Sequence, residues 1–389
     1  MVEMRSVLTA LAIWCAGLGA AAQFGKMSVI FDQLGQVYAG RGAVGIGLMI
    51  SVIGIIGLVL GTTMGMLVAR IGPKRAMLGA LALGAAVSLF QSFVPPFGWM
   101  MASRLPEGLS HLAIVVVGPT AIAATANKRF QGLVMTLWGS FFGLTFSVLA
   151  WIGPHLVAGY GVGMLFGLHG LWLLVVLCAL AVLLPADPDR SALPPRPDLW
   201  TLHRDTYASP RIAAPAMGFV CYTVTYVAVL TLLPGAATPG WGHFLAVAMP
   251  LISIAVSLTL GVALLGWISA VQLVQAGFVL ALLAAIGLWQ FWGAGPFEAT
   301  CALMLASAMG IVQGASFASI PQLNATSEAR ARAAGAIAQL GNLGTTTGTP
   351  LLAFLLQHSG RGGLALFLIL FSILGISLHR LQAARRVAG

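Results

Sequence analysis

Charge is the property that this sequence has least of. Only 7% of its 389 residues are Asp, Glu, Lys or Arg, and the acidic residues number nine. Because soluble globular domains contain about 25% charged residues, this composition excludes a water-soluble globular protein. The rest of the composition agrees, since 59% of the residues are hydrophobic and the mean hydropathy is +0.98. We therefore expect an integral membrane protein.

Cysteine and nucleotide-binding motifs are also scarce. The four cysteines, Cys15, Cys178, Cys221 and Cys301, stand singly, so neither a disulfide framework nor a paired metal knuckle is expected. No segment of the sequence matches the phosphate-binding pattern GxxxxGK[ST], which argues against an ATP-driven pump. The apolar segments offer no nucleophile with a base beside it in sequence, so we expect no enzyme activity and no cofactor.

Apolar segments follow one another along the chain, separated by Pro, Gly and polar residues. A bilayer core requires about 20 apolar residues in each helix, and the period-two alternation of transmembrane barrels is missing. The pattern predicts an all-α integral membrane protein with twelve transmembrane helices. We expect these helices at residues 7–31, 43–68, 76–95, 98–124, 130–154, 162–184, 211–234, 243–265, 270–292, 299–320, 335–357 and 364–380.

The 19 basic residues lie mostly on one side of this predicted topology if the N-terminus is cytoplasmic. Lys and Arg are concentrated in the cytoplasmic loops of membrane proteins. We therefore expect a multi-pass protein of the cytoplasmic (inner) membrane with both termini in the cytoplasm. The net charge of +10 then reflects topology and contact with the anionic lipid bilayer, and no nucleic-acid partner is expected.

The longest polar segment, residues 185–210, is rich in Pro and charge and lies near the middle of the chain. It predicts a cytoplasmic linker. The linker separates an N-terminal six-helix bundle, residues 1–184, from a C-terminal six-helix bundle, residues 211–389.

The two predicted bundles resemble each other in sequence. Pro119 and Gly139 match Pro321 and Gly341 at a common offset of 202 residues. A common offset indicates an internal repeat, so we expect two six-helix pseudo-repeats. Many secondary transporters are built from repeated halves with the substrate site between them.

A cluster of basic residues follows the second predicted helix, in the segment GMLVARIGPKR at residues 65–75. This segment resembles the GxxxDRxGRR loop between helices 2 and 3 of the major facilitator superfamily. A second element, Arg104-x-x-Glu107-Gly108, resembles that family's RxxQG element in helix 4. The resemblance implies a secondary transporter with a cytoplasmic gating loop, formed here by Gly65, Ala69, Arg70, Gly72, Lys74 and Arg75.

The sequence departs from the family pattern in three places. Ala69 replaces the acidic residue of the loop, so the cytoplasmic latch between the halves is expected to be weaker than in relatives. The corresponding loop of the second half, residues 265–273, carries no charge. In helix 5, Gly139 and Gly143 have the spacing of the drug-antiporter motif, but Leu144 stands where proline is expected, which argues against drug efflux.

Ionisable side chains within predicted spans are costly to insert, by about 2.5 to 3.5 kcal/mol each, and are therefore candidates for function. Arg104, Glu107 and His111 are spaced along one face of the fourth predicted helix. If that face lines a central cavity as in the family, Glu107 is the candidate proton carrier and His111 the alternative. The competing interpretation is an ion pair of Arg104 and Glu107 that only stabilises the bundle.

Lys26, late in the first span, is a candidate substrate-binding residue together with Arg104. Its competing role is to extend towards lipid headgroups. Lys26 and Arg104 against Glu107 give the interior one excess positive charge, which favours an anionic solute.

Uncharged polar residues supply further candidate substrate contacts in the C-terminal half. Tyr222 and Tyr226 share a face of the seventh predicted helix at i, i+4, where they suit stacking on a flat solute. Gln339 and Asn342 lie about one turn apart in the eleventh. Packing of the tyrosines and interhelical hydrogen bonds of the amides explain the same residues without a ligand.

The resemblance and these residues predict a monomeric, proton-coupled transporter of the facilitator type, which moves a small anionic organic solute by alternating access. Two alternatives remain open. The first is a copper importer, because soft ligands suit copper(I) and Met217 and Cys221 share a helical face, with His243 and Met249 on the next helix. The second is a facilitator-like protein that does not transport and acts as a sensor or assembly factor.

Overall fold

The computed structural model describes residues 2–125, 131–187 and 198–388, which form helices and their connections without any strand. The chain divides into two compact units. Unit 1 comprises Met1–Ala39 and Thr63–Pro194, and unit 2 comprises Gly40–Thr62 and Pro195–Gly389. The predicted linker, residues 185–210, lies partly outside the described residues, and the predicted boundaries of the two bundles stay a prediction.

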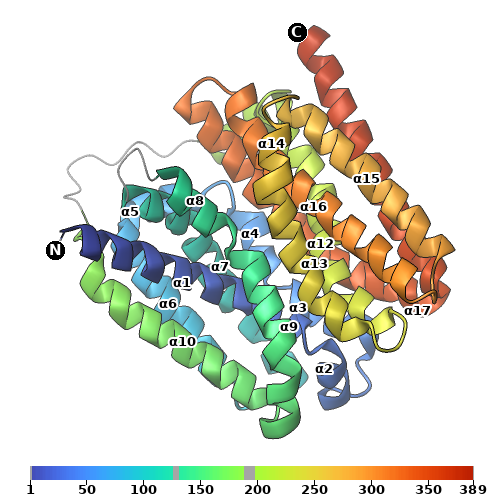
Figure 1. Ribbon diagram of the computed structural model, residues 1–389. Coiled ribbons are helices and arrows are strands. Elements are labelled where there is room, and N and C mark those ends of the chain that lie inside the picture. The colour runs from blue at the N-terminus through green and yellow to red at the C-terminus, as the bar shows by residue number, and fades with distance from the viewer. Residues whose placement is uncertain (1, 126–130, 188–197, 389) are drawn as a thin grey trace. The chain divides into compact units, whose positions relative to one another are not determined.

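Unit 1 is built around α1. This helix packs against α7, α9 and α10, while α6 packs against α7 and α10, and Figure 1 shows α1, α6 and α10 side by side. The helices of unit 1 are α1 (Val2–Ser28), α2 (Phe31–Val37), α5 (Met64–Ile71), α6 (Pro73–Gln91), α7 (Phe97–Ala124), α8 (Gln131–Gly139), α9 (Phe141–Tyr160) and α10 (Val162–Leu183).

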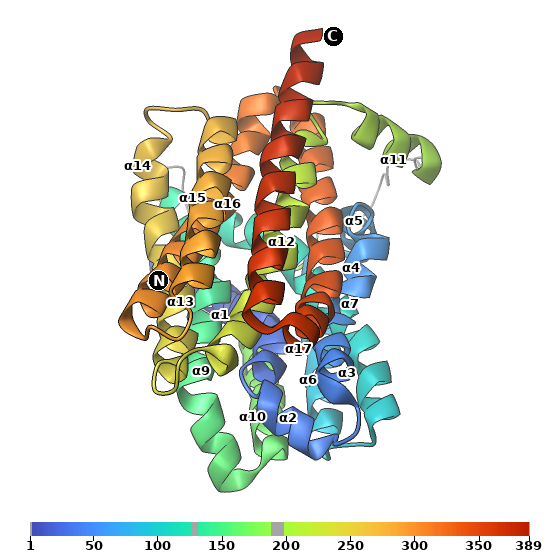
Figure 2. The ribbon, with the colours of Figure 1, turned by 90° about the vertical axis from the view of Figure 1, so that its right-hand side faces the viewer.

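Unit 2 is built around α17, which packs against α12 and α15 and also against α3 and α4. Figure 2 shows the last turns of α17 extending beyond the neighbouring helices of this unit. The helices of unit 2 are α3 (Gly42–Ser51), α4 (Gly54–Leu60), α11 (Leu199–Ala208), α12 (Ala214–Ala236), α13 (Gly242–Val256), the π-helical turn η1 (Ser257–Gly261), α14 (Val262–Leu264), α15 (Ala270–Gln290), α16 (Pro296–Leu323) and α17 (Ser327–Ala388).

Many of these helices are long and apolar enough to cross a membrane. Within the described residues there are nine such helices, or up to ten if α3 and α4, which are bent by 46° at their junction, form one broken span. The 62-residue α17 contains two predicted spans and is interrupted at Gly360, whose φ of 49° is not helical. The all-helical membrane architecture is confirmed, while the number twelve and the two pseudo-repeats stay predictions.

The second predicted span, residues 43–68, is not one continuous helix but the sequence α3, α4 and α5. Glycines explain how α4 lies so close to α17. A Cβ atom on Gly54 would come within 3.0 Å of the Asn342 carbonyl oxygen, and a Cβ on Gly57 would overlap the Asn342 side chain. A glycine inside a helix also lowers the stability of that helix by about 1 kcal/mol relative to alanine. The glycines of this segment therefore explain both the close packing of α4 against α17 and the interruption of the predicted span.

Candidate functional site

The charged residues predicted within spans gather inside unit 1. Lys26 lies late in α1, while Arg104 and Glu107 lie early in α7. All three side chains are entirely buried, with 0% of their surface exposed. Because α1 and α7 run in opposite directions, the end of one and the beginning of the other meet at the same end of the unit.

Two cations converge on the Glu107 carboxylate. The Lys26 Nζ lies 2.6 Å from Glu107 Oε1, and Arg104 Nη1 is paired with Glu107 Oε2. Arg104 also donates from Nη2 to the Gln23 carbonyl oxygen at 2.8 Å, which ties α7 to α1. The i, i+3 pair expected from the sequence is therefore present, and Lys26 joins it from a second helix. We call these three residues the buried charge cluster.

Polar side chains from α6 and α10 complete the surroundings of Lys26. Its ammonium donates to Ser88 Oγ at 2.6 Å and to Gln91 Oε1 at 2.7 Å, and lies 3.3 Å from His169 Nδ1. It also lies 5.3 Å from the centre of the Phe166 ring, within the range of a cation–π contact. The snorkelling role considered for Lys26 does not occur in this structure, because its side chain is turned into the unit.

Gln91 connects Lys26 to the carboxylate. Its amide nitrogen donates to Ser103 Oγ at 2.9 Å and to Glu107 Oε2 at 2.7 Å, while its amide oxygen accepts from Lys26. Both ends of the amide are thus used, which fixes its orientation. A buried polar group that lacks partners costs about 1–3 kcal/mol, so this satisfied arrangement explains how the charges are tolerated.

The sequence reasoning missed Ser88, Gln91 and His169. The signal that was available is the presence of polar side chains in otherwise apolar segments, for example the single histidine in VGMLFGLHGLWLL. That signal marks a candidate but names no partner. Ser88 and His169 are 81 residues apart, and only the packing of α6 against α10 brings them together.

A second polar contact lies one to two turns further along α7. Gln23 donates to Ser110 Oγ at 2.9 Å, and Ser110 donates to the Ala80 carbonyl oxygen at 2.7 Å. Gly84 of α6 makes room for this contact, because a Cβ there would lie 2.5 Å from Ser110 Oγ. The contact joins α1, α6 and α7 about one helical turn along α7 from Glu107 of the buried charge cluster.

His111, the predicted alternative proton carrier, lies beside these groups. Its Nδ1 is 2.9 Å from the Ala20 carbonyl oxygen and therefore carries the proton of that hydrogen bond. The ring packs edge-on against Phe24, with 5.0 Å between the ring centres. Its role in proton coupling stays a prediction.

In unit 2, the predicted aromatic contacts stack on each other. The ring centres of Tyr222 and Tyr226 are 5.0 Å apart with 25° between the planes, and both side chains are buried. Phe219 adds a third ring at 5.0 Å from Tyr222. The shared face expected from the spacing is present, and substrate stacking on it stays a prediction.

The two predicted amides of α17 are engaged with neighbouring helices of unit 2. Gln339 accepts from the Tyr207 hydroxyl at 2.7 Å and donates to the Leu58 carbonyl oxygen at 2.9 Å. Asn342 donates to the Ala338 carbonyl oxygen at 2.7 Å and packs against Gly57. Gln339 therefore links α17 to α4 and α11, whereas Asn342 is hydrogen-bonded within α17 itself. The role of both amides as substrate contacts stays a prediction.

The residues of the copper alternative lie on α12 and α13 of unit 2. Met217 accepts a hydrogen bond from Gln382, and Cys221 and Met249 are buried in the same unit. His243 stands at the beginning of α13. In the part of the chain that the structure describes, no three His, Cys, Asp or Glu side chains are grouped as a metal site requires.

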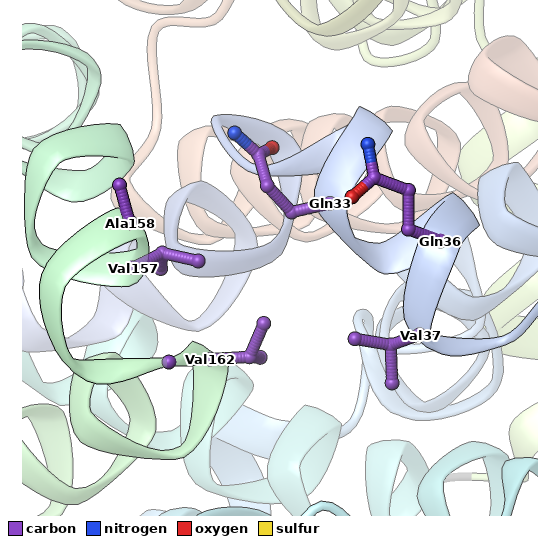
Figure 3. Close-up of a pocket in the computed structure, with 7 residues that line it drawn as sticks. Gln33, Gln36, Val37, Val157, Ala158 and Val162 are labelled. Atoms are coloured by element: carbon purple, nitrogen blue, oxygen red, sulfur yellow. The ribbon is translucent and has the colours of Figure 1, made fainter.

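One pocket lies in unit 1, apart from the buried charge cluster. It has a volume of about 450 Å³ and is lined on one side by Gln33 and Gln36 of α2 and on the other by Val157 and Val162. Figure 3 shows the two amide side chains on α2 across from the valines of α9 and α10. The lining contains no charged residue, so the pocket offers shape and hydrogen bonds but no charge recognition.

Residues 9–349 of the chain match the sequence profile of the Major Facilitator Superfamily. The chain belongs to this superfamily. A superfamily member with many apolar helices is a membrane protein of the transporter class, which favours transport over catalysis.

Two relatives are consistent with the assignment to the superfamily. The inner membrane transport protein YajR of Escherichia coli (strain K12) is 23% identical over 216 residues, which are 53% of this chain and 45% of that protein. The chain thus aligns with less than half the length of this relative. A solved bacterial homologue of the human lysosomal transporter Spinster, inward-facing and unoccupied, has a TM-score of 0.72 at 12% identity. The superposition covers 98% of this chain and 97% of the chain of that homologue, which shows that the two proteins share a fold.

The superfamily loop between α5 and α6 has an unexpected acidic partner. Asp187, four residues after the end of α10, accepts from the backbone N–H of Lys74 at 2.7 Å and of Arg75 at 3.2 Å. Gly72 has a φ of 96°, and a Cβ there would overlap the Asp187 carboxylate. The carboxylate therefore caps the N-terminus of α6, where a negative charge is favourable.

Lys74 completes the contact in the opposite direction. Its Nζ donates to the Leu184 carbonyl oxygen at 2.7 Å, at the C-terminal end of α10, where a cation is favourable. The Arg75 side chain is largely exposed and lies 3.9 Å from Asp187, so it adds little. Ala69 is exposed, and the acid that serves this loop within unit 1 comes from Asp187 instead. The predicted weaker latch between the halves stays a prediction.

Proposed function

We propose that this protein is a secondary active transporter that moves a small anionic organic solute together with a proton, by alternating access. The observation that carries the proposal is the convergence of Lys26 and Arg104 on the single carboxylate of Glu107. We further propose that it acts in the cytoplasmic membrane with both termini in the cytoplasm, as the distribution of basic residues favours.

The charge of the cluster supports an anionic solute. Two cations and one carboxylate, all without exposed surface, leave one excess positive charge in the interior of unit 1. Burying an unbalanced charge is unfavourable, so binding of an additional anion beside the cluster lowers the electrostatic free energy. A solute carboxylate or phosphate meets that requirement, whereas a cationic or neutral solute does not.

The geometry of Glu107 supports coupling to a proton. One carboxylate oxygen of Glu107 is paired with Lys26 and the other with Arg104. A solute anion that binds these cations therefore competes with Glu107. Protonation of Glu107 removes this competition and frees Lys26 and Arg104. Because one proton and one monovalent anion arrive together, the charge of the interior is the same in the empty and loaded states.

Binding of a solute at the cluster requires a rearrangement within unit 1. The three side chains have no exposed surface in this structure, and α1 and α7 are held together by the contact from Arg104 to the Gln23 carbonyl oxygen. We propose that protonation of Glu107 loosens this contact and opens the space between α1 and α7. Tyr222, Tyr226, Gln339 and Asn342 are the proposed contacts from unit 2.

The experiment has two stages. Purified protein is first screened for thermal stabilisation by organic anions, neutral solutes and metal ions, because a ligand that binds only the folded state raises the melting temperature. The best ligand is then added to proteoliposomes that contain a fluorescent pH indicator. We expect an organic anion to stabilise the protein and to enter with acidification of the lumen.

Matched variants identify the carboxylate responsible. Glu107→Gln is expected to abolish the coupled proton flux. Glu298→Gln serves as the control, because Glu298 is also buried but is held by Thr238 and the Gly293 N–H in unit 2. Stabilisation by copper(I) alone, lost in Met217→Ala and Cys221→Ala, would instead establish the copper alternative. Unchanged solute and proton fluxes in Glu107→Gln would refute the coupling role of Glu107.

A further inference from the structure

His169 ends a short chain of hydrogen bonds that starts at Lys26. The Lys26 Nζ lies 2.6 Å from Ser88 Oγ, and Ser88 Oγ lies 2.6 Å from His169 Nδ1. On the other side of the ring, His169 Nε2 lies 2.9 Å from the Gly19 carbonyl oxygen. A carbonyl oxygen only accepts hydrogen bonds, so Nε2 carries a proton and Nδ1 of the neutral ring is left as an acceptor.

The protons of Lys26 are all accounted for by its neighbours. An ammonium group has three N–H donors. The shortest contacts of Nζ are to Glu107 Oε1, Gln91 Oε1 and Ser88 Oγ, at 2.6, 2.7 and 2.6 Å. Ser88 accepts from Lys26 and is therefore free to donate its own proton to His169 Nδ1. The bonds of this chain thus all point from the charged lysine towards the histidine.

We propose that Lys26, Ser88 and His169 form a proton relay between α1 and α10, an inference that rests on the proton coupling proposed above. In the relay, the Ser88 O–H bond breaks as an N–H bond forms at His169 Nδ1. One Lys26 N–H bond breaks as the Ser88 hydroxyl is restored. Lys26 becomes a neutral amine and His169 an imidazolium, and the total charge and number of protons do not change.

The relay transfers a positive charge away from Glu107. With the proton on Lys26, Glu107 has two cationic partners, and with the proton on His169 it keeps only Arg104 as a direct one. The attraction between α1 and α7 is therefore weaker in the second state. The relay gives unit 1 two electrostatic states that differ in how firmly these two helices are held together.

The groups around His169 define the path of this exchange. The ring faces Lys26 of α1, whose Nζ lies 3.3 Å from His169 Nδ1, and Lys26 is in turn paired with Glu107 of α7, which also binds Arg104. From α6 the ring contacts Ser88, which does not titrate and accepts a hydrogen bond from Lys26. Gln91 of α6 also does not titrate and is hydrogen-bonded to Lys26. The Nε2–H bond to Gly19 is kept in both states, so the ring needs no rotation to receive the proton.

Nuclear magnetic resonance of protein labelled with ¹⁵N-histidine in lipid vesicles tests the relay. The His169 signals are assigned by their loss in His169→Asn, and the protonation of Nδ1 is followed as the pH changes. We expect Nδ1 to be unprotonated at high pH and to gain a proton within the range where the protein stays folded. In Ser88→Ala, we expect its exchange with the Lys26 proton to slow by at least tenfold.

Ser92→Ala is the matched control, because Ser92 follows α6 one turn after Ser88 and donates to the Leu89 carbonyl oxygen outside the cluster. It should leave the His169 signals unchanged. An Nδ1 atom that never gains a proton in the wild type would overturn the relay, even if Ser88→Ala does not fold. Equal exchange in wild type and Ser88→Ala would overturn it as well.

Proton flux in proteoliposomes separates this inference from the proposed function. If His169 never gains a proton while the solute still carries protons inward, the relay is wrong and proton coupling stands. If the solute moves without protons, the proposed proton coupling is wrong regardless of the protonation of His169. Protonation of His169 Nδ1 would then be a local equilibrium that is not linked to transport.

Discussion

Neutralising Glu107 tests the buried charge cluster most directly. Glu107→Gln keeps the shape of the side chain but leaves Lys26 and Arg104 buried without their shared carboxylate. Unit charges 2.6 Å apart, the distance from Lys26 Nζ to Glu107 Oε1, attract each other by about 6 kcal/mol at an effective dielectric constant of about 20. Desolvation offsets part of this attraction, and removing one partner of a buried pair typically costs about 3–5 kcal/mol.

A double-mutant cycle isolates the ionic contribution. Lys26→Met removes one cation, so in the double variant the second substitution relieves part of the damage of the first. We expect the two effects to be less than additive by about 2–3 kcal/mol, within the range that contacting residues show. For a domain of this size, Glu107→Gln alone should lower the melting temperature by roughly 6–20 °C at about 2–4 °C per kcal/mol.

The assay is tryptophan fluorescence during thermal unfolding in detergent, combined with denaturant titration. The control cycle pairs Lys26→Met with Glu298→Gln, whose partners Thr238 and Gly293 lie in unit 2. Substitutions without shared partners add to within about 0.5 kcal/mol, so this cycle should show no coupling. The same additivity for Lys26→Met with Glu107→Gln would refute the view that their ion pair stabilises unit 1.

Three further predictions concern the loop and the linker helix. Asp187→Ala removes the cap of α6 and should lower the free energy of unfolding by about 0.5–2 kcal/mol, and the stability of Asp187→Asn should lie between those of the wild type and Asp187→Ala. Equal stability of the wild type and Asp187→Ala would contradict the capping role. Ala69→Asp should restore the cytoplasmic latch. The variant should therefore slow both transport and the labelling of cysteines introduced in the cavity, and unchanged rates of transport and labelling would refute the latch hypothesis. Tyr207→Phe should cost about 0.5–1.5 kcal/mol. Burial raises the pKa of Tyr207 to about 12, above about 10 in the unfolded chain. The stabilisation by Tyr207 is therefore complete below pH 10 and lost as the pH rises through 12, and a difference from Tyr207→Phe that persists above that pH would contradict it.

The helices and their ends were the most predictable features, because they depend on local sequence. The span expected at residues 98–124 is observed as Phe97–Ala124, and the turn after the second span falls at Gly72, with Pro73 beginning α6. Residues 199–208 were not expected to be helical within the polar linker. There, Asp198 caps α11 by accepting from the Trp200 and Thr201 N–H groups, and the Thr201 bonds hold the pKa of Asp198 below its usual value.

The site was predictable only where partners lie on one helix. Arg104 and Glu107 are three residues apart, and their pairing followed from helix geometry. Lys26 was identified as unusual because charge within a span is rare, but its contact with Glu107 depends on how α1 packs against α7. Asp187 falls in the segment predicted as a cytoplasmic linker, and its contact with Lys74 spans 113 residues of sequence. No local pattern encodes contacts of that kind.

The two units hold their buried polar groups in different ways, and this difference separates the expected effects of substitutions in the two units on the pH dependence of transport. Within the described residues, the ion pairs that have no exposed surface all lie in unit 1, at Glu107. The candidate substrate contacts of unit 2 are neutral phenols and amides, which keep their charge state across the physiological range. If transport is proton coupled as proposed, substitutions at Tyr222 or Gln339 should therefore change solute affinity while leaving its pH dependence intact. Substitutions at Glu107 should change the pH dependence itself. Loss of pH dependence in Tyr222→Phe with retention in Glu107→Gln would reverse the roles assigned to the two units.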